Sequence, residues 1–334
     1  MFKFTAISAG LLCALAAPVA AEKFNITQVF SATHWHMTEG IQTFMDEVSA
    51  ASNGEITFEV YHAGQLGKES TTVVNSGLAQ MGILVPGYEV EKLPLTSVVE
   101  LPGFHTSACE GTMQYWELAK EGGALFEEEY KKLGVRPLYV MVLTPYEVQT
   151  NSAVVESVDD MKGLKLRANG ALAKAVDFLG GVPMQVTSPE FYDALARGVV
   201  DGGMWLSGST RLVGLEDVLN HTVKGTSMGA GSTMFAISEK VWQGLDEETQ
   251  KILMEAGEKT TRHMCEYLDR SGAEEEKWLV ENGKLTLHVL SPEQAAVWSE
   301  AIAPVASQWA DDMNSKGRAG TKVLDAYKAV AESM

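Results

Sequence analysis

The chain has 334 residues, a formal net charge of −18 at pH 7 and 46% hydrophobic residues. This length exceeds that of one typical hydrophobic core and predicts two domains. The acidic balance argues against nucleic acid and anionic lipid as partners, and an anionic ligand would need a local cationic pocket to overcome it.

The first 21 residues have the pattern of a secretory signal peptide. Lys3 forms a short positive region, residues 6–17 are apolar, and small residues precede a cleavage site after Ala21. The apolar stretch is too short and too rich in alanine for a membrane anchor, and Cys13 lies inside it without the small residues that precede a lipoprotein cysteine. The sequence therefore predicts a soluble protein exported to the periplasm, with no direct membrane insertion.

The rest of the chain alternates predicted strands and helices, which indicates an α/β fold with a mostly parallel sheet. Strands are expected at 24–30, 56–61, 81–85, 135–142, 164–168, 182–186, 232–238 and 285–290. Helices are expected at 38–51, 68–77, 108–133, 171–179, 247–281, 293–313 and 321–331. Because no flexible linker separates the elements, we expect two lobes joined by crossing strands, with a hinge and a cleft.

The most informative segment begins at Met161. Residues 164–168 alternate apolar and basic side chains as a short strand does, and the helix and strand that follow complete a βαβ unit. Ligands of open α/β sheets bind beyond the carboxyl ends of strands, and Arg167 lies at such an end. Its planar guanidinium suits a carboxylate held by two parallel hydrogen bonds. An ion pair with an acid at the domain surface is the alternative.

The same segment resembles the solute-binding subunit of TRAP transporters of the DctP type. The shared pattern is D-x-K-G-x-K-x-R from Asp160, followed by G-x-x-P and by E-x-Y-x-A-L-x-x-G-V-V-D-G, which ends at Gly202. Residues 44–66, 101–104 and 237–245 also match, so the resemblance covers almost the whole mature chain. In that family the arginine at the position of Arg167 grips the carboxylate of the solute.

The resemblance implies a two-lobed periplasmic-binding-protein fold with hinge strands and long C-terminal helices. It also implies capture of a small organic acid, integral-membrane transporter subunits as partners, and neither catalysis nor a cofactor. The expected divisions are a signal peptide (1–21), lobe I (22–147 plus 233–284), and lobe II with the C-terminal helical segment (148–232 plus 285–334).

Trp205 departs from the family pattern, because many members carry a polar run with an asparagine after D-G, whereas this chain has Met204 and Trp205. Trp205 either packs in the core of the second lobe or forms an aromatic wall beside the solute. The other candidate ligand-binding residues are Trp35, His36, Tyr88, Phe104, Tyr146 and Ser207, with Ser209 as a further hydroxyl. Together they suggest an aromatic-rich pocket.

These residues favour an apolar or aromatic monocarboxylate as the solute. A short 2-oxo or 2-hydroxy acid is the alternative, and a dicarboxylate is less favoured because no second arginine is recognisable near the expected cleft. A sensor that passes the bound solute to a membrane receptor is a further alternative to a transport protein.

Two other chemistries have partial signals. His34 and His36 have a spacing that zinc sites use, but the other histidines form no cluster along the sequence, so no metal is predicted. Ser227 lies in a G-x-S-x-G pattern, as in exported serine hydrolases. That motif needs a helix after the serine, whereas a strand is expected here, so the hydrolase is a remote alternative.

The mature chain has two cysteines, Cys109 and Cys265. An oxidising compartment permits a disulfide. Because the two positions lie far apart in the sequence, we expect free, buried thiols, with pairing left open.

Overall fold

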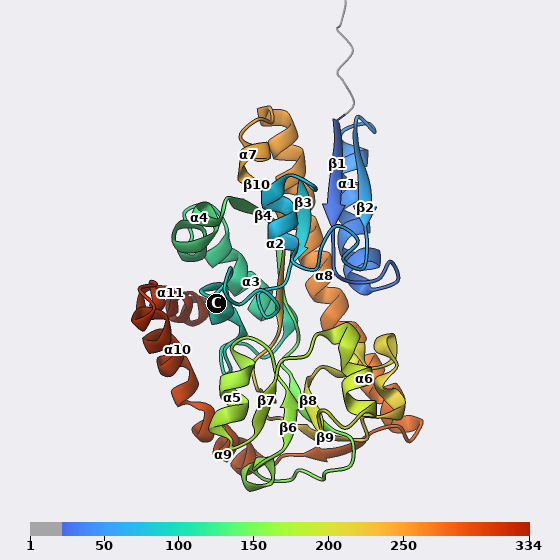
Figure 1. Cartoon of the computed structure of the whole chain (residues 1–334), viewed down its shortest axis with the longest axis vertical. Helices are drawn as coiled ribbons and strands as arrows, with labels where there is room; N and C mark the ends of the chain where they lie inside the picture. Colours follow the sequence, from blue (N-terminus) through green and yellow to red (C-terminus); the bar gives the residue numbers. More distant parts are fainter. Residues whose placement is uncertain (1–21) are drawn as a thin grey trace, which may run out of the picture.

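The computed structural model describes residues 22–334, so the predicted signal peptide lies outside the described residues. Two sheets organise the chain into two lobes (Figure 1). The first sheet has the order β2-β1-β3-β10-β4, and the second β11-β9-β5-β8-β6-β7. The first comprises β1 (Glu22–Thr27), β2 (Ile56–Tyr61), β3 (Met81–Leu84), β4 (Val135–Val142) and β10 (Ser232–Ser238). The second comprises β5 (Glu147–Thr150), β6 (Lys165–Arg167), β7 (Val182–Met184), β8 (Gly202–Trp205), β9 (His221–Lys224) and β11 (Thr286–Val289).

Both sheets are mixed. In the first, β1, β2 and β3 are parallel, while β10 runs antiparallel to β3 and β4. In the second, β6 is parallel to β7 and β8, while β5 is antiparallel to β8 and β9. Every residue of β4 is buried, because α3 and α8 pack against this strand.

Eleven α-helices surround the sheets in the described part of the chain. They are α1 (Gln42–Ala51), α2 (Ser70–Ser76), α3 (Ala108–Ala119), α4 (Lys131–Leu133), α5 (Leu172–Phe178), α6 (Phe191–Ala196), α7 (Glu239–Trp242), α8 (Glu247–Glu281), α9 (Pro292–Ile302), α10 (Pro304–Ser315) and α11 (Gly320–Ser333). The predicted helix 293–313 is divided at Pro304, whose ring cannot continue the hydrogen-bond ladder. The predicted helix 108–133 is interrupted after Ala119, and Gly122 there has a left-handed φ of 84°.

No helix between residues 22 and 334 combines the length and the apolar character that a bilayer span needs.

Four connections join the lobes, and one is the C-terminal segment, which leaves the second lobe after α9 and ends with α11 packed on α3 of the first. The segments 143–146 and 225–231 cross side by side, since Leu143 N donates to Gly231 O at 2.9 Å and Tyr146 N donates to Gly229 O at 2.7 Å. The fourth is α8, whose 35 residues span roughly 50 Å at the usual rise per residue. It runs from the first lobe to the second (Figure 1). If the lobes rotate relative to each other, this helix must bend, or one lobe must slide along it.

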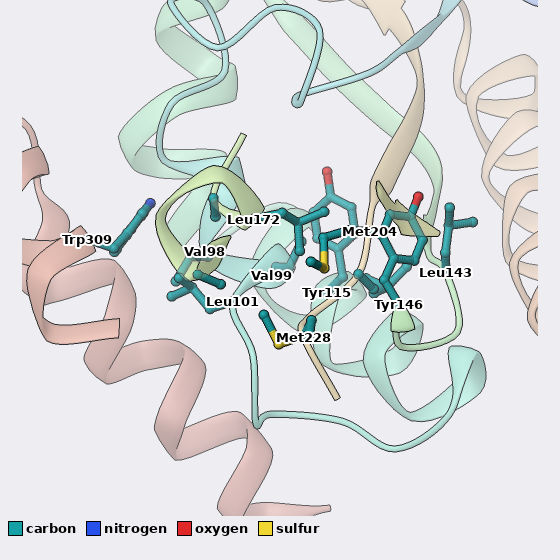
Figure 2. Close-up of a cluster of buried hydrophobic side chains, with 14 of the residues drawn as sticks. Val98, Val99, Leu101, Tyr115, Leu143, Tyr146, Leu172, Met204, Met228 and Trp309 are labelled. Carbon is teal, nitrogen blue, oxygen red and sulfur yellow. The ribbon is translucent and has the colours of Figure 1, made fainter. Parts of the chain in front are cut away.

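A continuous buried cluster also links the lobes (Figure 2). Figure 2 shows Tyr115 of α3 and Tyr146 of the crossing segment with Met204 of β8 and Leu172 of α5 in the same cluster. The C-terminal helices lie along one side, and α11 packs on α3. The lobes therefore share apolar contacts in this structure.

The structure corrects the expectation of free thiols. Cys109 and Cys265 form a disulfide with 4.6 Å between their Cα atoms. The bond joins the start of α3 to the middle of α8. The two helices pack on the same sheet, which brings together cysteines that are distant in sequence.

Candidate ligand-binding site

A small enclosed cavity lies between the lobes, where strands of both sheets end. Segments after β1 and β3 line it from the first lobe, and segments after β6, β7 and β8 line it from the second. The cavity has a volume of about 60 Å³, which suits a small solute rather than a drug-sized one. The position agrees with the rule that ligands bind beyond the carboxyl ends of strands.

Arg167, the last residue of β6, lies in this cavity and is only 3% exposed. Its Nε donates to Val186 O at 3.0 Å and its Nη1 donates to Met204 O at 3.1 Å. Among residues 22–334, the arginines that form ion pairs are Arg136, Arg211 and Arg262, so Arg167 has no acidic side chain in direct ion-pair contact, although Glu100 lines the same cavity. A buried cation without a direct ion-pair partner is costly, and the remaining N–H donors face the cavity and the hydroxyls of Tyr88 and Tyr146.

Two tyrosines lie near the guanidinium. Tyr88 OH accepts a hydrogen bond from Ser188 N at 2.8 Å, which connects the first lobe to the second. Burial raises the pKa of Tyr88, and burial raises the pKa of Tyr146 to about 12, while Arg167 opposes both shifts. Both phenols are therefore neutral hydroxyls that line the cavity beside the arginine.

Trp205, the last residue of β8, is 1% exposed. Its surroundings agree both with packing in the core of the second lobe and with a place beside the solute. Its ring packs against Phe191 at 5.1 Å between centroids, in the core of the second lobe. It also lines the cavity, with the Arg167 guanidinium carbon 5.1 Å from its centroid. Its indole Nε1 is buried without a hydrogen-bond partner. This N–H is a donor that the protein itself does not use.

The loop after β1 supplies an aromatic wall. Phe30 stacks on the rings of His34 and His36 at 4.4 and 4.5 Å, and the π-helix η1 (His36–Ile41) begins at His36. Burial lowers the pKa of His34 to about 3 and lowers that of His36 well below its usual value. Both imidazoles are therefore neutral. Within residues 22–334, no three His, Cys, Asp or Glu side chains gather into a metal-binding group.

Sequence reasoning missed several polar residues of the cavity, among them Asn169 and Glu100. Asn169 donates to Val186 O at 2.7 Å and accepts from Val186 N at 3.1 Å, which holds the carbonyl that Arg167 also binds. Glu100 closes the 3-10 helix η2 (Thr96–Glu100) and lines the cavity. The sequence does contain a signal for Glu100, which is an acid inside the apolar run around Val99 and Leu101. A carboxyl is rarely buried without a specific partner or role.

Two candidates lie elsewhere. Phe104 stacks on Tyr327 of α11 at 4.5 Å between centroids and does not line the cavity. Ser207 accepts from Gln149 Nε2 at 3.3 Å and faces a separate surface groove. Two residues further on, Ser209 does line the cavity, and its Oγ accepts from Trp35 Nε1 across the lobes at 3.2 Å. The 3-10 turn that follows β8 directs Ser209, rather than Ser207, inward.

Ser227 lies in the crossing segment between β9 and β10 and has a left-handed backbone, with φ of 46°. A strand follows it, as the sequence predicts, whereas a nucleophile elbow requires a helix.

The chain matches the model of the bacterial extracellular solute-binding protein family 7 (DctP) over residues 27–312, and it belongs to this family. It is thus an extracellular solute-binding protein of the DctP type. The ectoine-binding periplasmic protein TeaA of Halomonas elongata is 22% identical over 285 residues, which cover 83% of this chain and 81% of TeaA.

Two solved structures have the same fold. A TRAP solute-binding protein from Rhodoferax ferrireducens, in complex with copurified benzoate, superimposes with a TM-score of 0.84 at 21% identity, over 93% of this chain and 98% of that one. A protein from Bordetella bronchiseptica with bound (R)- and (S)-mandelate gives 0.82 at 22% identity, over 93% and 99%. These likenesses establish the two-lobed fold.

Proposed function

We propose that this protein captures a small monocarboxylate with an apolar or aromatic body between its lobes and delivers it to the membrane subunits of a TRAP transporter. The observation that carries the proposal is Arg167, a buried guanidinium in the cavity with which no acid of the described chain forms a direct ion pair. A solute carboxylate supplies a direct ion-pair partner for Arg167, and the rings of Phe30, Trp35 and Trp205 supply an apolar wall for its body. Benzoate and mandelate, bound by proteins of the same fold, have this chemistry.

The test is a calorimetric titration of the mature protein. The panel contains benzoate and mandelate, lactate and pyruvate, succinate, galacturonate, and benzamide as the uncharged counterpart of benzoate. We expect an aromatic monocarboxylate to bind best and benzamide not to bind. Preference for lactate or pyruvate would support the short-acid alternative instead.

Arg167→Ala is the decisive variant, and Arg197→Ala is its matched control, because Arg197 is an exposed arginine of the same lobe. Arg167→Ala should lose about 2–5 kcal/mol of binding free energy, and Arg197→Ala should bind like wild type. Equal affinities in the two variants would overturn the carboxylate assignment.

The proposal includes export and cleavage of residues 1–21. N-terminal sequencing of the periplasmic fraction should find Glu22 as the first residue. A start at Met1, or retention in the cytoplasm, would contradict the export step. Neighbouring genes for membrane subunits would favour transport over a sensory role.

A further inference from the structure

Glu100 is a buried acid in the same cavity as Arg167. It is 2% exposed, and its Oε1 accepts from Ser232 N at 3.2 Å and from Ser232 Oγ at 2.9 Å. The other oxygen, Oε2, has no hydrogen-bond partner of normal geometry, although the nearby backbone N–H of Ala171 lowers the pKa of the carboxyl. It lies against Gly170 of the second lobe, where an added Cβ would come within 2.5 Å of it. The carboxyl is thus fixed at one oxygen and uncommitted at the other, at the junction of the lobes.

Three groups face Glu100, and one of them is charged. They are Arg167 from β6, Tyr115 from α3 and Tyr146 from the crossing segment. Burial raises the pKa of both tyrosines, so they are neutral. The cavity's histidines, His34 and His36, are neutral as well because burial lowers their pKa values. Within the described chain, the charge balance of the cavity therefore depends on Glu100 and Arg167.

We propose that Glu100 makes solute binding proton-linked: when a solute carboxylate pairs with Arg167, the Glu100 carboxylate takes up one proton from solvent on Oε2. The inference rests on the proposed function. In the empty cavity, the positive charge of Arg167 favours ionised Glu100. A bound carboxylate cancels that charge and places a second negative group in the same buried space, where two carboxylates disfavour each other's ionisation.

The group is poised for this change. Burial raises the pKa of Glu100 to about 7, against the opposing effects of hydrogen bonds from Ser232 and from the Ala171 backbone N–H, and of the charge of Arg167. Loss of the Arg167 contribution raises the pKa further, so protonation follows binding near neutral pH. A dicarboxylate would add one more negative charge to the same cavity, so Glu100 also selects for solutes with a single carboxylate.

The test is calorimetry near pH 7.5 with whichever monocarboxylate of the panel binds, in phosphate, HEPES and Tris buffers. These buffers differ in ionisation enthalpy, so the dependence of the observed heat on the buffer gives the number of protons taken up. Wild type should take up a substantial fraction of one proton, and Glu100→Gln should take up none. Glu129→Gln is the matched control, because burial also raises the pKa of Glu129 to about 7 but this residue lies outside the cavity; it should keep the uptake.

The outcomes separate the two proposals. If no carboxylate binds, the proposed function fails. If one binds with heats that do not depend on the buffer, or if Glu100→Gln keeps the uptake, the proton linkage is wrong. Should Glu100→Gln not fold, Ser232→Ala serves instead, because its hydroxyl lowers the Glu100 pKa. Above a certain pH, solute affinity should weaken by up to tenfold per pH unit. Ser232→Ala should move this pH upward, and an unchanged dependence of affinity on pH would overturn the inference.

Discussion

At the scale of single residues, Arg167 performs two tasks with one planar group. Nε and Nη1 bind two backbone carbonyls, while the rest of the fork faces the cavity. A lysine ammonium cannot keep both carbonyls and grip a carboxylate with two bonds. Arg167→Lys should therefore lose about 2 kcal/mol or more of solute binding, measured by calorimetry. Wild-type affinity in this variant would mean that positive charge alone, without the fork, holds the solute.

Gly203 of β8 lies directly opposite Arg167 of β6 in the sheet, where there is no room for a side chain. A Cβ at this position would lie 2.8 Å from both Arg167 Cβ and Phe191 Cζ, which is too close for real atoms. Gly203→Ala should lower stability by about 1–3 kcal/mol and weaken solute binding by displacing Arg167. Gly272→Ala in α8 is the control, since its nearest atom would be 3.9 Å away; it should not destabilise. Denaturant unfolding of both variants decides, and equal midpoints would refute the packing argument.

At the scale of elements, the disulfide clamps α3 to α8. Asp269 of α8 reinforces the junction, because its carboxylate accepts from Ala108 N at 2.7 Å and from Cys109 N at 3.2 Å. Neither cysteine lines the cavity. Replacing Cys109 and Cys265 together by alanine should cost about 2–5 kcal/mol of stability and leave solute affinity unchanged.

Thermal unfolding with and without a reductant tests the clamp. Reductant should lower the Tm of wild type toward that of the double variant and should not change the variant. A wild-type Tm that is insensitive to a reductant able to reach the bond would contradict a stabilising role.

At the scale of the whole molecule, hydrogen bonds between the lobes set the balance between closed and open forms. The bond from Trp35 Nε1 to Ser209 Oγ spans the cleft at 3.2 Å. Ser209→Ala should weaken solute binding by about 0.5–1.5 kcal/mol and speed dissociation, because the closed state loses this link. Ser207→Ala is the matched control, since its hydroxyl bonds Gln149 within the second lobe. If Ser209→Ala and Ser207→Ala release the solute at the same rate in stopped-flow measurements, the hydrogen bond between Trp35 and Ser209 does not hold the lobes together.

Stability should depend on pH through the buried histidines. The pKa of His34 falls from its usual 6.5 to about 3 on burial, so below pH 6.5 the unfolded chain binds protons that the folded chain does not. Stability is then lost as the pH falls from 6.5 toward 3, by up to about 1.4 kcal/mol per pH unit for one such group. His34→Gln should show a flatter acid limb in urea unfolding at several pH values. If the stability of this variant falls with decreasing pH as steeply as that of wild type, the acid sensitivity belongs to other groups.

Much of the fold could be predicted because the spacing of apolar residues along the chain matches the periods of helices and strands. The limits of β2, β4 and α8 agree with their predicted ranges. Three short strands, β5, β8 and β9, were not predicted, since four residues carry little periodicity and the glycines of β8 resemble a loop. The disulfide was also missed, because pairing depends on which helices meet on the sheet and not on sequence spacing.

The sequence by itself determined the α/β class, the family and the position of Arg167 at a strand end, because these depend on local patterning and on a contiguous motif. Only the tertiary structure decided which side chains surround that arginine. Phe104 belongs to the contact with α11, Ser209 replaces Ser207, and Glu100 joins the cavity from a segment that no motif marks. A side chain's direction and burial depend on the crossing of segments far apart in the chain, and that arrangement has no local signature.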